Sequence, residues 1–224
     1  MKQPISNQTV EFETGHIYHV FNRGNNSQRL FFTRDNYLFF IEKIRTYILP
    51  HADLLAWCLM PTHFHLMVHV NEIRMPVKSE GYAPFNSLPV RASLEVKPSL
   101  SKKSRSLNDS IGIMLRSYSR AIQKQENRTG SLFQKATKAR CLTQTDGISP
   151  AWFQSRYGAI ISRAFAEDDY PQVCFDYIHA NPVKDGLVGH IEEWAFSSAR
   201  DYAGLRNGKL TNKERANEFG LVYR

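Results

Sequence analysis

Residues 54–70 read LLAWCLMPTHFHLMVHV, two apolar runs separated by the dipeptide Pro61-Thr62. The first run, residues 54–60, is continuously apolar, which is typical of a central strand covered on both faces. In the second run, residues 63–70, one face carries Phe64, Leu66, Val68 and Val70, and the other carries His63, His65, Met67 and His69. Because the connection is so short, we predict an antiparallel hairpin at the centre of a sheet.

The second strand places His63 and His65 on the same face, roughly 6–7 Å apart along the backbone. Two imidazoles at this spacing suit one divalent cation, although such a pair is also common as a structural or solvent-facing feature. Zinc normally needs three or four Cys or His ligands, and Cys58 lies in the apolar strand. Two imidazoles with an oxygen ligand, water and a phosphate oxygen therefore favour Mg²⁺ or Mn²⁺, which would polarise a phosphodiester. His69 lies roughly 13 Å beyond His65 and is predicted to face solvent or to contact phosphate.

The chain has 224 residues and a net charge of +8. Residues 101–140 hold ten basic residues against two acidic ones, so this segment accounts for the whole excess. Such concentration indicates a surface for a polyanion, with a solvated helix face as the alternative. Three scattered cysteines disfavour disulfides and favour a reducing compartment, and no apolar run approaches the roughly 20 residues of a membrane span. We therefore expect a cytoplasmic, nucleoid-associated protein without a membrane partner.

The remaining elements follow from periodicity and turn chemistry. Residues 15–22 and 131–142 are predicted as strands, and residues 35–49, 108–127 and 171–180 as helices. Residues 143–170 are ambiguous, and a helix over residues 151–165 is one interpretation of them. Residues 71–108 contain five prolines or glycines at intervals, and we predict a long mobile insertion at the mouth of the site, with a linker between domains as the alternative. The chain is expected to form one domain, with residues 143–224 as a C-terminal helical extension.

The predicted helix 108–127 combines an apolar stripe with a basic ridge. Tyr118 shares its stripe with Ile111, Leu115 and Ile122, where a tyrosine is usually part of the core with its hydroxyl bonded to a partner. The ridge has strict four-residue spacing and consists of Arg116, Arg120, Lys124 and Arg128. Beside such a ridge, a tyrosine could meet a phosphate backbone and attack phosphorus if a metal aligned the phosphate.

Several separated motifs resemble those of the REP-associated tyrosine transposases. Tyr18-His19-Val20-Phe21-Asn22-Arg23-Gly24 resembles their opening strand, and Met60-Pro61-Thr62-His63-Phe64-His65 resembles their metal motif. Tyr118, twelve residues before Gly130-Ser131-Leu132-Phe133, is similar to their nucleophile. Tyr177-Ile178-His179-Ala180-Asn181-Pro182-Val183 and Trp194 with Ser197-Ser198 resemble their C-terminal signature. Together the motifs span residues 16–204.

The resemblance implies an α+β fold, a ferredoxin-like antiparallel sheet with helices packed on one face. It implies metal-dependent cleavage and rejoining of single-stranded DNA at hairpins, with DNA transposition as the outcome. His63 and His65 would bind Mg²⁺ or Mn²⁺, and Tyr118 would form a 5′-phosphotyrosine link. Arg23 and the basic ridge would contact phosphates. Members act as monomers or homodimers.

The resemblance also implies an amide metal ligand about one helical turn beyond the tyrosine. The residue four positions after Tyr118 is Ile122, which cannot bind a metal, so Gln123 is the nearest candidate and Gln125 the second. Two other functions remain open: a catalytically silent DNA-hairpin-binding protein, and a metal-dependent phosphodiesterase without a covalent tyrosine step.

Overall fold

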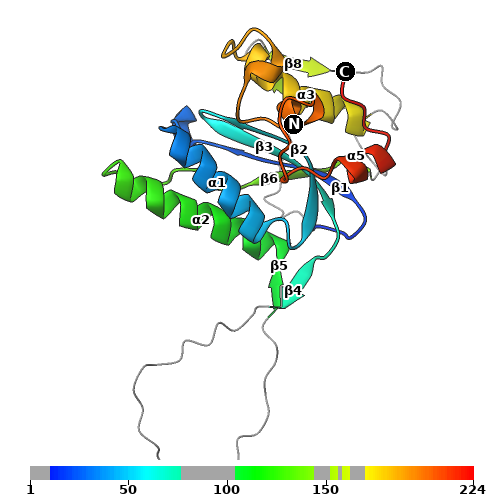
Figure 1. The fold of residues 1–224 in the computed structure, drawn as a ribbon. Helices are drawn as coiled ribbons and strands as arrows, with labels where there is room; N and C mark the ends of the chain where they lie inside the picture. Colours follow the sequence, from blue (N-terminus) through cyan, green and yellow to red (C-terminus); the bar gives the residue numbers. More distant parts are fainter. Residues whose placement is uncertain (1–10, 77–103, 144–151, 156–157, 162–169) are drawn as a thin grey trace, which may run out of the picture.

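The computed structural model describes residues 11–76, 104–143, 152–155, 158–161 and 170–224. Its main sheet has four antiparallel strands in the order β2 (Ala52–Met60), β3 (His63–Val70), β1 (Ile17–Arg23) and β6 (Lys138–Cys141). Helix α1 (Arg34–Tyr47) connects β1 to β2, and α2 (Leu107–Gln125) comes between β3 and β6 in the chain (Figure 1). This order of strands and helices is ferredoxin-like, so the predicted α+β fold is confirmed.

The central hairpin has the predicted register. Met60 pairs with His63 across the two-residue turn, and the pairing continues to Ala52 and Val70 with one irregularity between Leu54 and Ala56. The alternation in β3 therefore sends its apolar residues to one face of the sheet and its histidines to the other.

The first face of the sheet is covered by α1 and α2, which lie side by side in Figure 1. Val20, Leu66 and Phe64 of the sheet share a buried apolar cluster with Phe40 of α1 and Tyr118 of α2. Helix α1 begins after Thr33, whose backbone N–H donates to the side-chain oxygen of Asn36. Helix α2 begins after Ser106, whose hydroxyl accepts from the N–H of Asp109 in a capping box.

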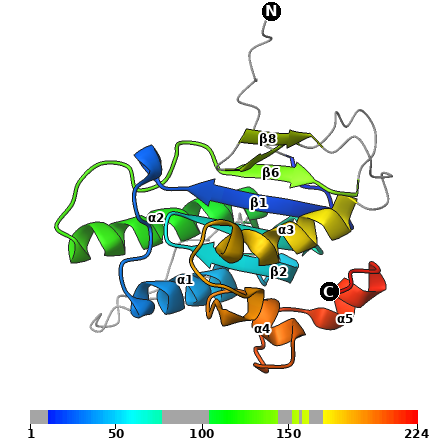
Figure 2. The same ribbon diagram turned by 90° about the horizontal axis from the view of Figure 1, so that it is seen from above.

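The second face carries the histidines and is covered by α3 (Tyr170–Lys184), as Figure 2 shows from above. Cys174, Phe175 and Ile178 of α3 pack with Cys58 and Met67 of the sheet in a second apolar cluster. The two helices of the ferredoxin-like unit, α1 and α2, pack on one face as expected, and α3 from the C-terminal extension covers the other face. The predicted helix 171–180 was too short, because Pro182 lies in its last turn and does not end it.

The C-terminal segment lies along the outer edge of β2. It contains η3 (Ile191–Glu193), α4 (Ala199–Tyr202) and α5 (Lys213–Glu218). The backbone N–H of Ser198 donates to the carbonyl of Trp57, and the N–H of Leu59 donates to the carbonyl of Phe196, both at 2.9 Å. These bonds satisfy an edge that would otherwise be open to pairing with another chain.

The remaining elements are short. A 3₁₀ turn η1 (Asn25–Ser27) follows β1, and β4 (Arg74–Pro76) pairs with β5 (Ser104–Ser106) at the two ends of the insertion. The insertion between them, residues 77–103, lies outside the described residues, so the prediction of a mobile segment there stays a prediction.

Two predicted elements differ from the structure. Strands β7 (Trp152–Ser155) and β8 (Gly158–Ile161) pair in the ambiguous segment for which a helix was one interpretation, and aromatic and β-branched residues there favour extended backbone. The predicted strand 131–142 forms only at its end, as β6. No helix in the described ranges is long and apolar enough to cross a membrane.

Candidate active site

Three histidines from two neighbouring strands meet on the α3 face of the sheet. The ring centres of His63 and His65 lie 5.1 Å apart, with the rings nearly perpendicular. The Nε2 atom of His19 on β1 lies 2.9 Å from the Nδ1 atom of His65. His19 reaches this face because alternate residues of a strand point the same way, and β1 is hydrogen-bonded to β3.

Burial keeps these histidines neutral. It lowers the pKa of His19 to about 3 and that of His63 to about 4, and it lowers the pKa of His65 well below its usual value. Neighbouring charge adds to this effect, from Arg140 at His19 and from Arg23 at His63, while Asp185 raises the pKa of His63. A neutral imidazole keeps a lone pair on one ring nitrogen, which is the form that binds metals.

In the hydrogen-bonded pair of His19 and His65, one ring nitrogen of His65 has no partner. Its Nε2 atom is buried and has no hydrogen-bond partner within the described part of the chain. When Nδ1 of His65 donates to His19, Nε2 carries the lone pair, so His19 would fix the tautomer of His65. His63 uses Nδ1 toward the hydroxyl of Thr62, at 3.0 Å.

Helix α3 brings a tyrosine to the histidines. The ring centre of Tyr177 lies 5.4 Å from that of His65 and 6.2 Å from that of His19, both in edge-to-face arrangements. Burial raises the pKa of Tyr177 to about 12, and a side-chain hydrogen bond with Asn181 acts in the opposite direction. The ammonium of Lys184 lies 4.9 Å from the centre of the Tyr177 ring.

One helical turn beyond Tyr177 lies the amide of Asn181. Its Nδ2 atom donates to the backbone carbonyl of Tyr177 at 2.7 Å, and the side chain is only 5% exposed. With Nδ2 engaged in this bond, the carbonyl oxygen Oδ1 is the atom left to accept a donor or bind a cation. The candidate site therefore combines imidazole, amide and phenol groups on one face of the sheet.

Tyr118 lies on the opposite face. It is fully buried in the cluster of α1 and α2, and its hydroxyl donates to the backbone carbonyl of Leu30 at 2.8 Å. Burial raises the pKa of its phenol strongly. The sheet separates Tyr118 from His63 and His65, so the pairing of these residues in one site is wrong for this structure. Tyr118 is instead a core residue, as its position in the apolar stripe of the helix indicated.

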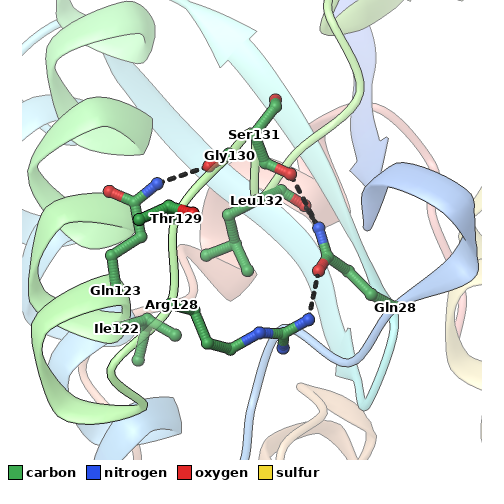
Figure 3. Close-up of a pocket in the computed structure, with 8 residues that line it drawn as sticks. All are labelled: Gln28, Ile122, Gln123, Arg128, Thr129, Gly130, Ser131 and Leu132. Carbon is green, nitrogen blue, oxygen red and sulfur yellow. Dashed lines mark hydrogen bonds between the residues drawn. The ribbon is translucent and has the colours of Figure 1, made fainter.

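The two glutamines considered as metal ligands also lie away from the histidines. Gln123 is turned toward the loop after α2, where its Nε2 atom bonds to the carbonyl of Gly130 (Figure 3). Gln125 bonds to Asn36 and Glu126. Neither amide can complete the predicted site, because both project from the helix that covers the other face of the sheet.

His69 is also placed differently from the prediction. It is only 8% exposed, its Nδ1 atom lies 2.9 Å from Oδ1 of Asn71, and its ring packs on Phe219. His69 therefore has a structural role and does not face solvent.

The predicted DNA contacts divide between the two sides of the sheet. Arg23 ends β1, pairs in register with His63 and lies on the histidine side. Arg116, Arg120 and Lys124 are exposed along α2, on the other side. Arg128, just beyond α2, donates to Gln28 at 2.9 Å (Figure 3). Of these five predicted contacts, Arg23 is the one on the same side of the sheet as the histidines.

Among the described residues, no group of three or more histidine, cysteine, aspartate or glutamate side chains is arranged to hold a metal ion. A site here would thus depend on the histidine pair and an amide oxygen. The orphaned Nε2 atom of His65 fits such a site, since a buried polar atom without a partner is costly unless a ligand satisfies it.

Similarity to known proteins is found in the fold. No family model and no curated protein sequence match this chain. A structure described as a REP-associated tyrosine transposase bound to a REP hairpin is similar, with a TM-score of 0.49 and 18% identity over 93% of this chain and 94% of that chain. That description names the family that the sequence motifs resemble.

Sequence reasoning missed His19, and it placed Tyr177 and Asn181 only within a signature without a role. The signals were present: His19 lies at an alternate position of the first strand, and Tyr177 and Asn181 are four residues apart, as on one helix face. What the sequence could not supply was the side of the sheet that each helix covers.

Proposed function

We propose that this protein cleaves and rejoins single-stranded DNA at hairpin sites, in a metal-dependent reaction with Tyr177 as the nucleophile. The observation that carries the proposal is the position of Tyr177, 5.4 Å from His65 between ring centres, on the histidine face of the sheet. The resemblance of the motifs to REP-associated tyrosine transposases supports the same reaction, with DNA transposition as its outcome.

The spacing within α3 supports this assignment of the tyrosine. Relatives carry an amide ligand about one turn after the nucleophile, and Asn181 stands four residues after Tyr177. At Tyr118 the corresponding residue is Ile122, which has no ligand atom. The missing amide is thus explained if the nucleophile is Tyr177.

His63, His65 and Asn181 would hold Mg²⁺ or Mn²⁺ through imidazole nitrogens and an amide oxygen. When bound, the cation supplies charge stabilisation at the scissile phosphate. His19 acts as a positioning residue, because its contact with Nδ1 leaves Nε2 of His65 available.

The protein's own groups account for the remaining steps. The Tyr177 oxygen bonds to phosphorus while the bond from phosphorus to the 3′ oxygen breaks, and the proton of the phenol passes to that oxygen, which leaves as a 3′-OH. Attack by another 3′-OH reverses the step and releases the phenol. Lys184 stabilises the phenolate by its positive charge near the ring, and Arg23 contacts a flanking phosphate.

A covalent adduct tests the proposal. The protein is incubated with 3′-end-labelled hairpin DNA carrying single-stranded flanks and Mn²⁺, then denatured and separated by size, because the fragment that stays on the tyrosine is the one with the 3′ end. We expect a labelled adduct with the wild type and with Tyr118→Phe, and none with Tyr177→Phe. An adduct that persists in Tyr177→Phe, or that depends on Tyr118, would overturn this assignment.

One observation favours a second function, a catalytically silent DNA-hairpin-binding protein. Helix α3 covers the histidines so closely that His65 is only 5% exposed. In that case the same assay would show hairpin binding with no cleavage and no adduct. Cleavage without an adduct, unaffected by Tyr177→Phe, would instead indicate a phosphodiesterase.

A further inference from the structure

On the other side of the sheet, a groove of about 410 Å³ lies between α2 and the segment that leads to β6. One wall is formed by α2, with Gly112, Arg116 and Arg120, and the opposite wall includes Gln134 and Lys135. Asn22 of β1 contributes to the lining, and its Nδ2 atom is fixed by a 3.0 Å bond to the hydroxyl of Thr137. The groove is therefore built from three separate segments of the chain.

The lining is positively charged. It includes Arg116, Arg120 and Lys135 and contains no acidic side chain among the described residues. None of these three cations takes part in an ion pair within the described ranges, whereas Arg45, Arg206 and Arg215 do. Uncompensated cations on both walls of a groove favour an anionic ligand.

The spacing of the cations suits a phosphodiester backbone. Arg116 and Arg120 are four residues apart on one helix face, a rise of roughly 6 Å. This is close to the separation of neighbouring phosphates along one strand, and guanidinium groups bind phosphate with two donors each. A groove of about 410 Å³ can hold only a short stretch of nucleic acid, and its cations are spaced for the phosphates of one strand, so a single strand is the occupant that we assign to it.

Gly112 gives the groove part of its shape. A side chain at this position would place its Cβ atom 3.1 Å from Nη1 of Arg116, so the glycine leaves the space in which the guanidinium lies. Glycine within a helix costs about 1 kcal/mol relative to alanine.

We infer that this groove binds the backbone of a single DNA strand, at a site separate from the histidine face. The inference rests on the proposed function for the identity of the polyanion. Asn22 and Arg23 link the two regions, because adjacent residues of β1 point to opposite faces: Asn22 lines the groove and Arg23 lies beside His63. If a DNA strand is bound at the histidines, the groove would therefore hold the flanking part of the same DNA strand, which would pass the end of β1 between the two sites.

The test measures affinity of the full chain for an oligo-thymidine strand as a function of salt. We expect Arg116→Glu with Arg120→Glu to weaken binding by about tenfold or more, and to reduce the slope of log affinity against log salt by about 1.4, at 0.7 per lost contact with a single strand. Lys209→Glu with Lys213→Glu is the control: it makes the same charge change in the C-terminal segment, beside the other edge of the sheet. Gly112→Ala should give a smaller loss in the same direction, because only the Arg116 side chain must shift.

The outcomes separate this inference from the proposed function. Equal losses in the groove variant and the control, or no loss in either, would overturn the groove as the site. A loss confined to a blunt, fully paired hairpin would overturn the assignment to a single strand. At saturating DNA the groove variant should still form the Tyr177 adduct, whereas failure of the adduct in the wild type bears on the proposed function alone.

Discussion

The hydroxyl of Tyr118 donates a 2.8 Å hydrogen bond to the backbone carbonyl of Leu30, within the core on the α1–α2 side of the sheet. This contact joins α2 to the segment before α1. It also engages the hydroxyl of Tyr118, which the sequence predicted to be the nucleophile. The two tyrosines therefore have different roles. Tyr118 stabilises the fold, and Tyr177 stands at the candidate site.

Tyr118→Phe should therefore change stability and leave DNA cleavage intact. Removing the hydroxyl leaves the buried carbonyl of Leu30 without this donor, which costs about 1–3 kcal/mol. Denaturant unfolding followed by circular dichroism measures the loss. Tyr47→Phe, at a partly exposed tyrosine of α1, should change stability by less than about 0.5 kcal/mol. A Tyr118→Phe protein as stable as the wild type would contradict the structural role.

Mn²⁺ should stabilise the folded protein through the histidine site. At a free concentration 100-fold above the Kd, binding contributes about 2.7 kcal/mol, which for a chain of this size raises the Tm by roughly 5–10 °C. His63→Ala and His65→Ala should abolish the shift, and Asn181→Ala should reduce it. His190→Ala changes an exposed histidine and should keep it. If Mn²⁺ raised the Tm of His65→Ala as much as that of the wild type, the metal would have to bind at another site.

The buried His179 should make stability depend on pH. Burial lowers its pKa to about 3, and its Nε2 atom lies 2.7 Å from the hydroxyl of Ser198. The unfolded chain has a histidine pKa near 6.5, so protons bind the unfolded state first and stability is lost as pH falls below that value.

The measurement is the free energy of unfolding of the wild type and of His179→Gln between pH 7 and pH 4. The wild type should fall more steeply, by up to about 1.4 kcal/mol per pH unit for the one proton. Parallel curves would show that His179 does not contribute. The buried histidines at the candidate site affect both proteins alike and cancel in the comparison.

The ion pair of Arg206 with Asp201 should be the most costly one to break. Asp201 is 1% exposed and receives bonds from the Nε and Nη2 atoms of Arg206, each at 2.7 Å. Arg206→Ala would leave a buried carboxylate unpaired, at a cost of about 3 kcal/mol or more. Arg215→Ala removes two more exposed pairs, with Asp53 and Glu218, and should cost about 1 kcal/mol or less. Thermal unfolding of the two variants compares them, and similar losses would contradict the role of burial.

Much of the fold could be predicted from the sequence because the signals were local. The alternation of residues 63–70 set which side chains share a face, and the two-residue turn set the hairpin. The helical periodicity of α1 and α2 gave both elements to within a few residues. Between 151 and 165 the local signal was ambiguous, and the aromatic and branched residues formed strands instead of a helix.

The candidate site was predicted in part. The sequence predicted that His63 and His65 are neighbours, because residues two apart on a strand point to the same face. In the structure their ring centres lie 5.1 Å apart. Tyr118 was favoured because it lies beside a basic ridge in the same helix, and two residues of that ridge, Arg116 and Arg120, line a charged groove. Periodicity shows that a helix has an apolar face, but it does not show which side of a sheet that face covers.

The sequence by itself thus determined the hairpin, the histidine pair and the concentration of positive charge in residues 101–140. Only the tertiary structure decided which tyrosine meets the histidines. Helix α2 packs with α1 on one face and buries Tyr118, while α3 packs on the other and brings Tyr177 and Asn181 to the histidines. The physical reason is that a sheet has two faces, and the distribution of helices between them is set by packing among segments far apart in the chain.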